Sequence, residues 1–205
     1  EDGGAGAPYG VVLNPAATDD AWALKDETGA VLRPGYSEYR VGDPYNPGFL
    51  ADLDAMVAED VAPRVGDPAL QMWFVGNEIG LFDRTDRSVQ GVRDFRRHLW
   101  SDCPVGSSPA APQCARHALA AFLEDRYGSI EALNAAWESD YPGQDFTTIV
   151  EAGPLPVPYE HDCSLTCRYD LQAFVHDHLL REWVHVVTTR IRAEDPHHLL
   201  SSPRL

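Results

Sequence analysis

The apolar run LQMWFVG occupies positions 70–76 and stops at the polar pair Asn77-Glu78. A nearly continuous apolar run of this length is typical of a parallel β-strand that is covered on both faces. The preceding residues, 47–65, carry apolar side chains at helical spacing, with Pro47 and Gly48 near the start. A helix that leads into a buried strand is the repeating unit of parallel α/β folds, so this stretch predicts that fold class.

The same alternation continues along the chain. Strands are expected at Tyr9–Leu13, Leu70–Gly76 and Leu199–Ser202. Helices are expected at 47–65, 88–100, 114–127, 128–137 and 169–195. Residues 22–32 predict a hairpin that turns at Thr28-Gly29, and residues 101–115 and 138–168 are predicted loop insertions. The rhythm predicts a parallel sheet or a barrel.

The composition of the chain limits the classes of molecule that it is expected to bind. The 205 residues are 44% hydrophobic and carry a formal net charge of −16, with Lys25 as the only lysine. Such a chain can bury the core of one domain, and it repels phosphate backbones and anionic lipids. No apolar run reaches the roughly 18–20 residues of a membrane span. We therefore expect no nucleic acid and no membrane partner, whereas a neutral substrate such as a sugar fits.

The first ten residues, EDGGAGAPYG, have neither the basic nor the apolar region of a signal peptide. We expect the numbering to begin after a cleavage or within a longer polypeptide.

The four cysteines lie in two loop-like segments, as the local pairs Cys103 with Cys114 and Cys163 with Cys167. Their even number favours two disulfides and an oxidising, extracellular location, with local pairing as the simplest connectivity and other connectivities left open. The alternatives are free buried thiols and a zinc site completed by His98, His117 or His161. No C-x2-C spacing supports zinc, so neither a metal nor a cofactor is expected.

Glu78 is the candidate catalytic residue. In a (β/α)8 barrel, catalytic groups lie at the carboxyl ends of strands, and Gly76 and Gly80 would let the backbone turn closely there. A partly desolvated carboxyl group has a raised pKa and can act as a general acid. Asn77 offers a donor and an acceptor to a sugar hydroxyl. The alternative is a helix start, with Asn77 as N-cap and Glu78 in the first turn.

Three stretches carry a family resemblance. GNEIG after an apolar strand resembles the acid/base motif of the retaining barrel glycosidases of glycoside hydrolase clan A. FLEDRYGSIEALNAAWESDY resembles the segment behind the acid/base Glu in bacterial β-galactosidases of that clan, and AEDPHHLLSSPRL resembles the passage before strand five. Residues 41–78 are similar to the agarase-type members. The resemblance covers roughly residues 40–205.

The resemblance implies part of a (β/α)8 TIM barrel, about strands three to five with their helices, so that residues 1–205 form the central portion of one glycosidase barrel domain. Carried over by position, Glu78 is the general acid/base and Asn77 contacts the sugar 2-hydroxyl. The nucleophile of the clan ends strand seven, about 5–5.5 Å from the acid/base. It therefore falls outside this chain, and the rest of the barrel must come from the same polypeptide or from a second chain.

Further substrate-binding candidates are Asn14, Phe82, Asp83, Trp137 and Arg204. Each has a structural alternative: a turn before proline for Asn14, a solvated loop for Phe82 and Asp83, core packing for Trp137 and a salt bridge for Arg204.

The sequence also departs from the galactosidase pattern. Tyr141-Pro142 stands where those members carry an aromatic pair, which puts β-galactosidase specificity in doubt.

The sequence thus predicts a secreted retaining glycoside hydrolase that cleaves a β-glycosidic bond in a galactan-like or other polysaccharide or oligosaccharide. The alternative is a non-catalytic carbohydrate-binding barrel relative that has lost one carboxylate. A third possibility is a structural half-barrel without a sugar site.

Overall fold

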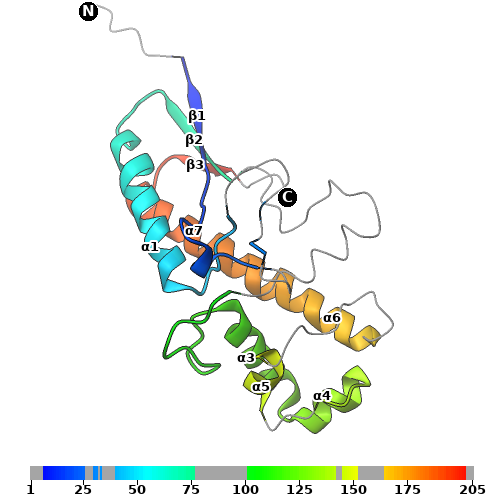
Figure 1. Ribbon diagram of the computed structural model, residues 1–205. Coiled ribbons are helices and arrows are strands. Elements are labelled where there is room, and N and C mark those ends of the chain that lie inside the picture. The colour runs from blue at the N-terminus through cyan, green and yellow to red at the C-terminus, as the bar shows by residue number, and fades with distance from the viewer. Residues whose placement is uncertain are drawn as a thin grey trace, which may run out of the picture.

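The computed structural model of the chain describes residues 7–25, 30–31, 33, 40–76, 101–141, 145–151 and 164–201. Within this part of the chain, one sheet has three parallel strands in the order β1-β2-β3 (Figure 1). The strands are Tyr9–Leu13, Leu70–Val75 and Leu199–Ser201. All three predicted strands are confirmed; β2 ends one residue earlier than expected, and Ser202, the expected last residue of β3, lies outside the described residues.

The two faces of this sheet differ in burial. Alternating side chains point to opposite faces, and Leu13, Trp73 and Val75 are buried on one of them. On the other, Val12 is 55% exposed and Leu199 is 64% exposed. We call this second surface the open face; its residues include Gly10, Val12, Met72, Phe74, Leu199 and Ser201. The apolar run of β2 predicts that other residues cover both faces of the sheet. In the described part of the chain, only the face of Leu13, Trp73 and Val75 is fully covered.

The helix predicted at 47–65 is confirmed. Helix α1, Pro47–Met56, continues through a π-helical turn at Val57–Val61 and a 3-10 turn at Ala62–Arg64. The Asn46 side chain caps α1, because its Oδ1 accepts the Gly48 N–H at 2.9 Å. Pro47 occupies the first turn, where a backbone N–H would lack a helical partner in any case.

The long helix predicted before Pro196 is also confirmed, and it begins four residues earlier than expected. Helix α6, Leu165–Ala173, passes through a π-helical turn at Phe174–Leu180 into α7, Arg181–Glu194. The start is fixed by Ser164, whose hydroxyl accepts the Cys167 N–H at 3.2 Å.

The predicted break at Tyr127-Gly128 separates helix α3, Ala115–Tyr127, from α4, Ile130–Trp137. Gly128 has a φ of 69°, in the left-handed region that glycine adopts without strain, and its N–H bonds to Glu124 O at 2.8 Å. Ser129 then caps α4 by accepting the Ala132 N–H at 3.2 Å.

The loop predicted at 138–168 needs correction. It contains helix α5, Phe146–Glu151, and the first turn of α6. Asp145 Oδ1 accepts the Thr148 N–H at 2.7 Å, which caps a helix too short to show a clear apolar period. Phe146, Ile149 and Val150 are buried and hold α5 in place.

The remaining predicted elements are described only in part. Residues 101–114 contain no helix, and α3 begins at Ala115. Lys25 and Val31 form an isolated antiparallel bridge, as the hairpin predicts, while its turn at Thr28-Gly29 and the helix at 88–100 lie outside the described residues.

Two groups of helices surround one core. Figure 1 shows α1 and α7 alongside the sheet, whereas α3, α4 and α5 lie together at the other end of the molecule beside α6. The largest fully buried side chains are Trp73, Trp137, Trp183, Phe49 and Phe174. Among the described helices none is long and apolar enough to cross a membrane.

Candidate active site

The carboxyl ends of the parallel strands meet at one edge of the sheet. Leu13 pairs with Val75, and Gly76 donates its N–H to Leu13 O at 2.6 Å. Gly76 is buried and has a φ of 69°, so the chain leaves β2 in a left-handed conformation that suits glycine. Asn14, which directly follows β1, is exposed at this edge. The carboxyl edge thus has a sharp backbone turn at Gly76, after β2, and the exposed amide side chain of Asn14, after β1.

The structure describes two of the predicted substrate-site residues, Asn14 and Trp137. Asn77 and Glu78 follow Gly76 directly in the sequence and lie outside the described residues. Phe82, Asp83 and Arg204 lie outside them as well.

Trp137 does not lie at the sheet edge. It ends α4 and is 1% exposed, with Tyr141 packed edge-on at 6.3 Å between ring centroids. Its indole N–H donates to Asp170 Oδ2 at 2.8 Å. Because its ring is enclosed by the core, the prediction that it stacks on a sugar is wrong.

Asp195 is a buried carboxylate that joins β2 to the start of β3. Its Oδ2 accepts the Trp73 indole N–H at 2.7 Å and lies 2.6 Å from His198 Nδ1. Its Oδ1 accepts the backbone N–H groups of His197 and His198 at 3.1 and 3.2 Å. Burial alone would raise the pKa of Asp195, but these hydrogen bonds outweigh it and lower the pKa to about 2.

Asp170, like Asp195, is a buried carboxylate that links separate elements, here the helices α3, α4 and α6. It lies on α6, is fully buried, and accepts hydrogen bonds at Oδ2 from Trp137 and from the Tyr127 hydroxyl. Arg126 Nε lies 2.7 Å from Asp170 Oδ1. One carboxylate therefore joins the end of α3 and the end of α4 to α6.

Asp43 anchors the loop that precedes α3. Its Oδ2 accepts the Ala115 N–H at 2.6 Å and the Ser101 hydroxyl, and its Oδ1 accepts the Tyr45 N–H at 2.9 Å. Burial raises the pKa of Asp43, although these three hydrogen bonds act in the opposite direction. Asp43 supplies the hydrogen bond at the start of α3 that the Cys114 side chain does not make.

The sequence predictions passed over these three carboxylates. Asp170 follows the apolar spacing of its helix, so a charge on the buried face was a usable signal. Asp195 follows the last residue of a helix and precedes proline, which indicates a turn but not the distant Trp73. Nothing local to Asp43 indicates its contact with Ala115.

A disulfide joins Cys103 and Cys114, with an S–S distance of 1.96 Å. This is the pairing that local connectivity favours. Cys167 is also disulfide-bonded, and its expected partner Cys163 lies outside the described residues.

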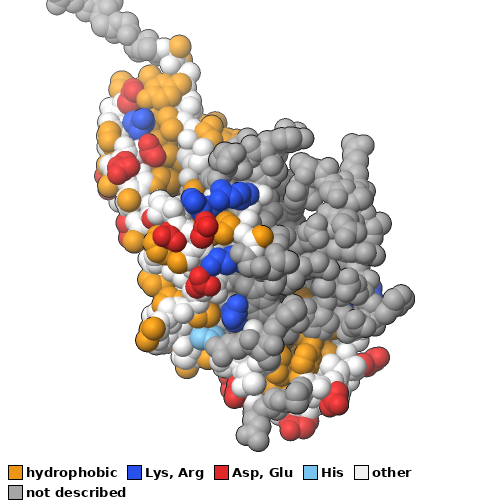
Figure 2. Space-filling view, in the orientation of Figure 1, with side chains coloured by type: hydrophobic (Ala, Val, Ile, Leu, Met, Phe, Trp, Pro, Cys, Tyr) orange, Lys and Arg blue, Asp and Glu red, His pale blue; other side chains and the backbone are white. Residues whose placement is uncertain are grey.

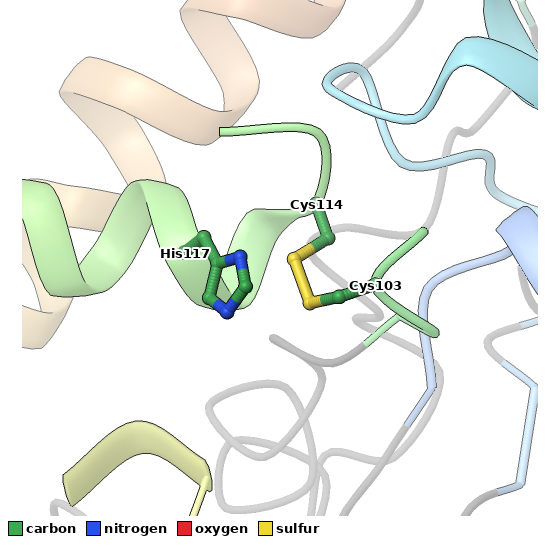
Figure 3. Close-up of side chains that lie close together, drawn as sticks. All are labelled: Cys103, Cys114 and His117. Atoms are coloured by element: carbon green, nitrogen blue, oxygen red, sulfur yellow. A yellow bond between two sulfur atoms is a disulfide. The ribbon is translucent and has the colours of Figure 1, made fainter. Parts of the chain in front are cut away.

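His117 lies beside the first disulfide (Figure 3). One ring nitrogen of His117 and the sulfur atoms of Cys103 and Cys114 all lie within 4.8 Å of one another. The Ser107 hydroxyl oxygen lies 2.7 Å from His117 Nδ1 and 3.8 Å from Cys114 Sγ. The other two histidines considered for a zinc site, His98 and His161, lie outside the described residues.

The surface charges form mixed pairs. Figure 2 shows basic side chains interspersed with acidic ones on the visible face. Lys25 Nζ lies 2.6 Å from Asp102, and Arg40 Nε lies 2.5 Å from Asp20. On the described part of this face we see no basic patch of the kind that binds nucleic acid.

Comparison with known proteins identifies relatives that are much longer than this chain. A β-galactosidase from Halorubrum lacusprofundi is 25% identical over 169 residues, which cover 78% of this chain and 20% of the relative. β-Agarase A from Vibrio sp. (strain JT0107) is 29% identical over 166 residues, covering 79% of this chain and 15% of the relative. The chain thus spans a fifth or less of the length of these two proteins.

A solved exo-β-agarase structure superposes with a TM-score of 0.68 at 18% identity, covering 97% of this chain and 24% of that one. The likeness shows a TIM-barrel-type α/β fold. Residues 22–201, most of the chain, match a glycoside hydrolase family described as β-galactosidase. The chain therefore belongs to glycoside hydrolase family 42, the β-galactosidase family.

Proposed function

We propose that this chain is the acid/base portion of a retaining glycoside hydrolase that cleaves a β-glycosidic bond in a galactan-like polysaccharide or oligosaccharide. The observation that carries the proposal is the exit of β2 at the carboxyl edge of the sheet. Gly76, buried and hydrogen-bonded to Leu13 O, directly precedes Asn77 and Glu78. In barrels, catalytic side chains project from this edge.

Glu78 would act twice. As an acid it protonates the leaving glycosidic oxygen while a second carboxylate attacks the anomeric carbon and forms a glycosyl-enzyme. As a base it then removes a proton from the water that hydrolyses this intermediate. Such proton transfer typically contributes about 10²–10⁴-fold to the rate.

Asparagine side chains would hold the sugar. Asn77 can donate to or accept from the 2-hydroxyl, an interaction that strengthens in the transition state. Asn14 is exposed at the same edge one strand away, which favours contact with a neighbouring hydroxyl. Phe82, Asp83 and Arg204 are proposed to line the subsites around the bond.

The substrate class rests on the relatives and on charge. The curated relatives are named β-galactosidase and β-agarase, which favours a galactose-containing glycan. The net charge of −16 favours a neutral glycan over a heavily sulfated one. Two cysteine pairs favour an extracellular location.

The nucleophile is proposed to come from the rest of the barrel. Of the described strands, β1 is followed by Asn14 and β3 reaches Ser201 without a carboxylate. If no further barrel segment supplied a glutamate at a strand end, the protein would be a carbohydrate-binding relative without hydrolase activity.

Replacing Glu78 by alanine in the intact protein tests the proposal. Hydrolysis of the natural glycan should fall by about 10²–10⁴-fold, because its leaving group needs a proton. Dinitrophenyl glycosides should still form the glycosyl-enzyme, which then stalls without a base. Azide needs no deprotonation, so it should restore turnover and yield the glycosyl azide of retained configuration.

Asn77→Ala serves as the matched control. It should weaken transition-state binding, and azide should give no rescue. Hydrolysis of the natural glycan by Glu78→Ala within a few-fold of the parent would show that Glu78 only starts a helix.

A further inference from the structure

We propose that reduction of the Cys103–Cys114 disulfide creates a metal site, with the two thiolates and His117 as ligands for Zn²⁺. None of these three residues is among the proposed catalytic or substrate-binding residues. The site would bind metal only when the disulfide is reduced. This binding would not depend on which glycoside the protein cleaves.

Three ligand atoms are already gathered. One from each of Cys103, Cys114 and His117 lies within 4.8 Å of the other two, and Cys114 and His117 are buried (Figure 3). Cys114 is the N-cap of α3 and His117 follows three residues later, within the first turn. Cys103 comes from the loop that Asp43 and Ser101 anchor to the start of the same helix. The backbone therefore holds the ligands together without relying on the S–S bond alone.

The surroundings favour a thiolate and an oriented imidazole. The positive end of the α3 dipole lies at its N-cap, Cys114, and favours a negatively charged group there. Cys114 makes no side-chain cap hydrogen bond there. The Ser107 oxygen, 2.7 Å from His117 Nδ1, also accepts the Gln113 N–H at 2.9 Å, so the hydroxyl that orients the ring is itself held by the backbone. Hydrogen-bond partners of this kind orient ligand histidines.

The chemistry balances in two steps. A phosphine reductant and one water cleave the S–S bond, giving two thiols and the phosphine oxide. A divalent ion then displaces the two thiol protons and gains two sulfur ligands and one nitrogen ligand, with water in the fourth position. Two cysteines and one histidine with an open position form a ligand set that zinc uses. The disulfide offers no thiolate, so the oxidised protein lacks two of the three ligands.

Cobalt titration of the intact protein tests the proposal, in a Cys163→Ser/Cys167→Ser background that leaves Cys103 and Cys114 as the one cysteine pair among residues 1–205. After phosphine reduction and removal of the reductant without air, one equivalent of Co²⁺ should give thiolate-to-cobalt charge-transfer absorption, and Zn²⁺ should displace it. The oxidised protein should show neither change. Charge transfer of equal strength in the oxidised protein, or none after reduction, would overturn the proposal.

Two variants separate ligation from adventitious thiol binding. His117→Ala should weaken Co²⁺ binding by more than tenfold, and Ser107→Ala by about 10–100-fold. The matched control, His178→Ala, removes an exposed imidazole on the long helix and should leave binding unchanged. Equal affinity in His117→Ala and the parent would eliminate the site.

Thermal melting covers the case in which reduction loosens the fold. Zn²⁺ should raise the melting temperature of the reduced parent and leave that of reduced His117→Ala unchanged. A reduced parent that Zn²⁺ does not stabilise would contradict the proposal. None of these measurements depends on glycosidase activity.

Discussion

At the residue scale, buried carboxylates tie distant parts of the chain together. Asp195 is fully buried, and Trp73, which donates to it, lies 122 positions earlier in the sequence. A buried charge is stable only when hydrogen bonds replace the lost water, and two side chains and two backbone N–H groups do so here. Asp195 thus links Trp73 on β2 to His198, which directly precedes β3, in the sheet whose carboxyl edge is the candidate site.

The low pKa of Asp195 predicts acid sensitivity. The folded-state pKa, about 2, lies below the usual value of 3.8, so ionised Asp195 stabilises the fold above about pH 4, and this contribution is lost as the pH falls toward 2. The difference corresponds to about 2 kcal/mol. Asp195→Asn should be less stable than the parent at pH 6 in denaturant unfolding, and the gap should close below pH 4.

Asp177→Asn is the control, because Asp177 is exposed on the same long helix. It should change neither the stability nor its pH dependence. Parallel pH curves for the parent and Asp195→Asn would refute the role of Asp195.

The sequence predicts residues at this scale only where the cause is local. The Gly128 turn was predicted from its immediate neighbours, whereas the Asn46 and Ser164 caps, although equally local, were not predicted. The burial of Trp137 does not follow from its neighbours, because helical spacing places it on an apolar face without showing which helix covers that face. The catalytic role of Glu78 was predicted from a rule for whole barrels, in which catalytic groups lie at the carboxyl ends of the strands.

At the element scale, helices α3, α4 and α6 are linked through the side chain of Asp170. Ends of α3 and α4 donate to a carboxylate on α6, so three helices share one polar contact inside an apolar cluster. Helices α3 and α4 and the later part of α6 were predicted from periodicity and from the break at Gly128, whereas α5 was missed. Its six residues are held by burial of Phe146 and Val150 against neighbours distant in sequence.

Asp170→Ala should destabilise the protein by roughly 3–5 kcal/mol, because it leaves the Trp137 indole and the Tyr127 hydroxyl without an acceptor and Arg126 without its partner. Denaturant unfolding measures the change. Asp177→Ala should stay within about 0.5 kcal/mol of the parent, as exposed substitutions do. A cost below about 1 kcal/mol for Asp170→Ala would mean that the three helices are held by apolar packing alone.

At the scale of the whole molecule, the described sheet has two edges and one open face. Strands β1 and β3 each pair only with β2 among the described residues, and apolar Val12 and Leu199 are more than half exposed. Unpaired edges and exposed apolar faces favour association. The relatives are several times longer, and in a closed barrel further strands would cover these edges and this face.

We therefore expect residues 1–205, expressed alone, to self-associate instead of forming a stable monomer. Size-exclusion chromatography with light scattering should detect oligomers or aggregates, and an apolar dye should bind. Co-expression with the segments proposed to complete the barrel should suppress both. A monodisperse monomer that melts cooperatively would contradict the prediction.

Opposite effects of one substitution make this prediction specific. Val12→Lys places a charge on the open face, so in the isolated chain it should reduce self-association. In the complete barrel the same position would face the interior, where an unpaired charge costs several kcal/mol, so the full-length protein should lose stability and activity. Val184→Lys is the matched control, because Val184 is 36% exposed on α7 and is not part of the open face, so it should have neither effect. If Val12→Lys left the full-length protein intact, the open face would be an outer surface and would not face the interior of a closed barrel.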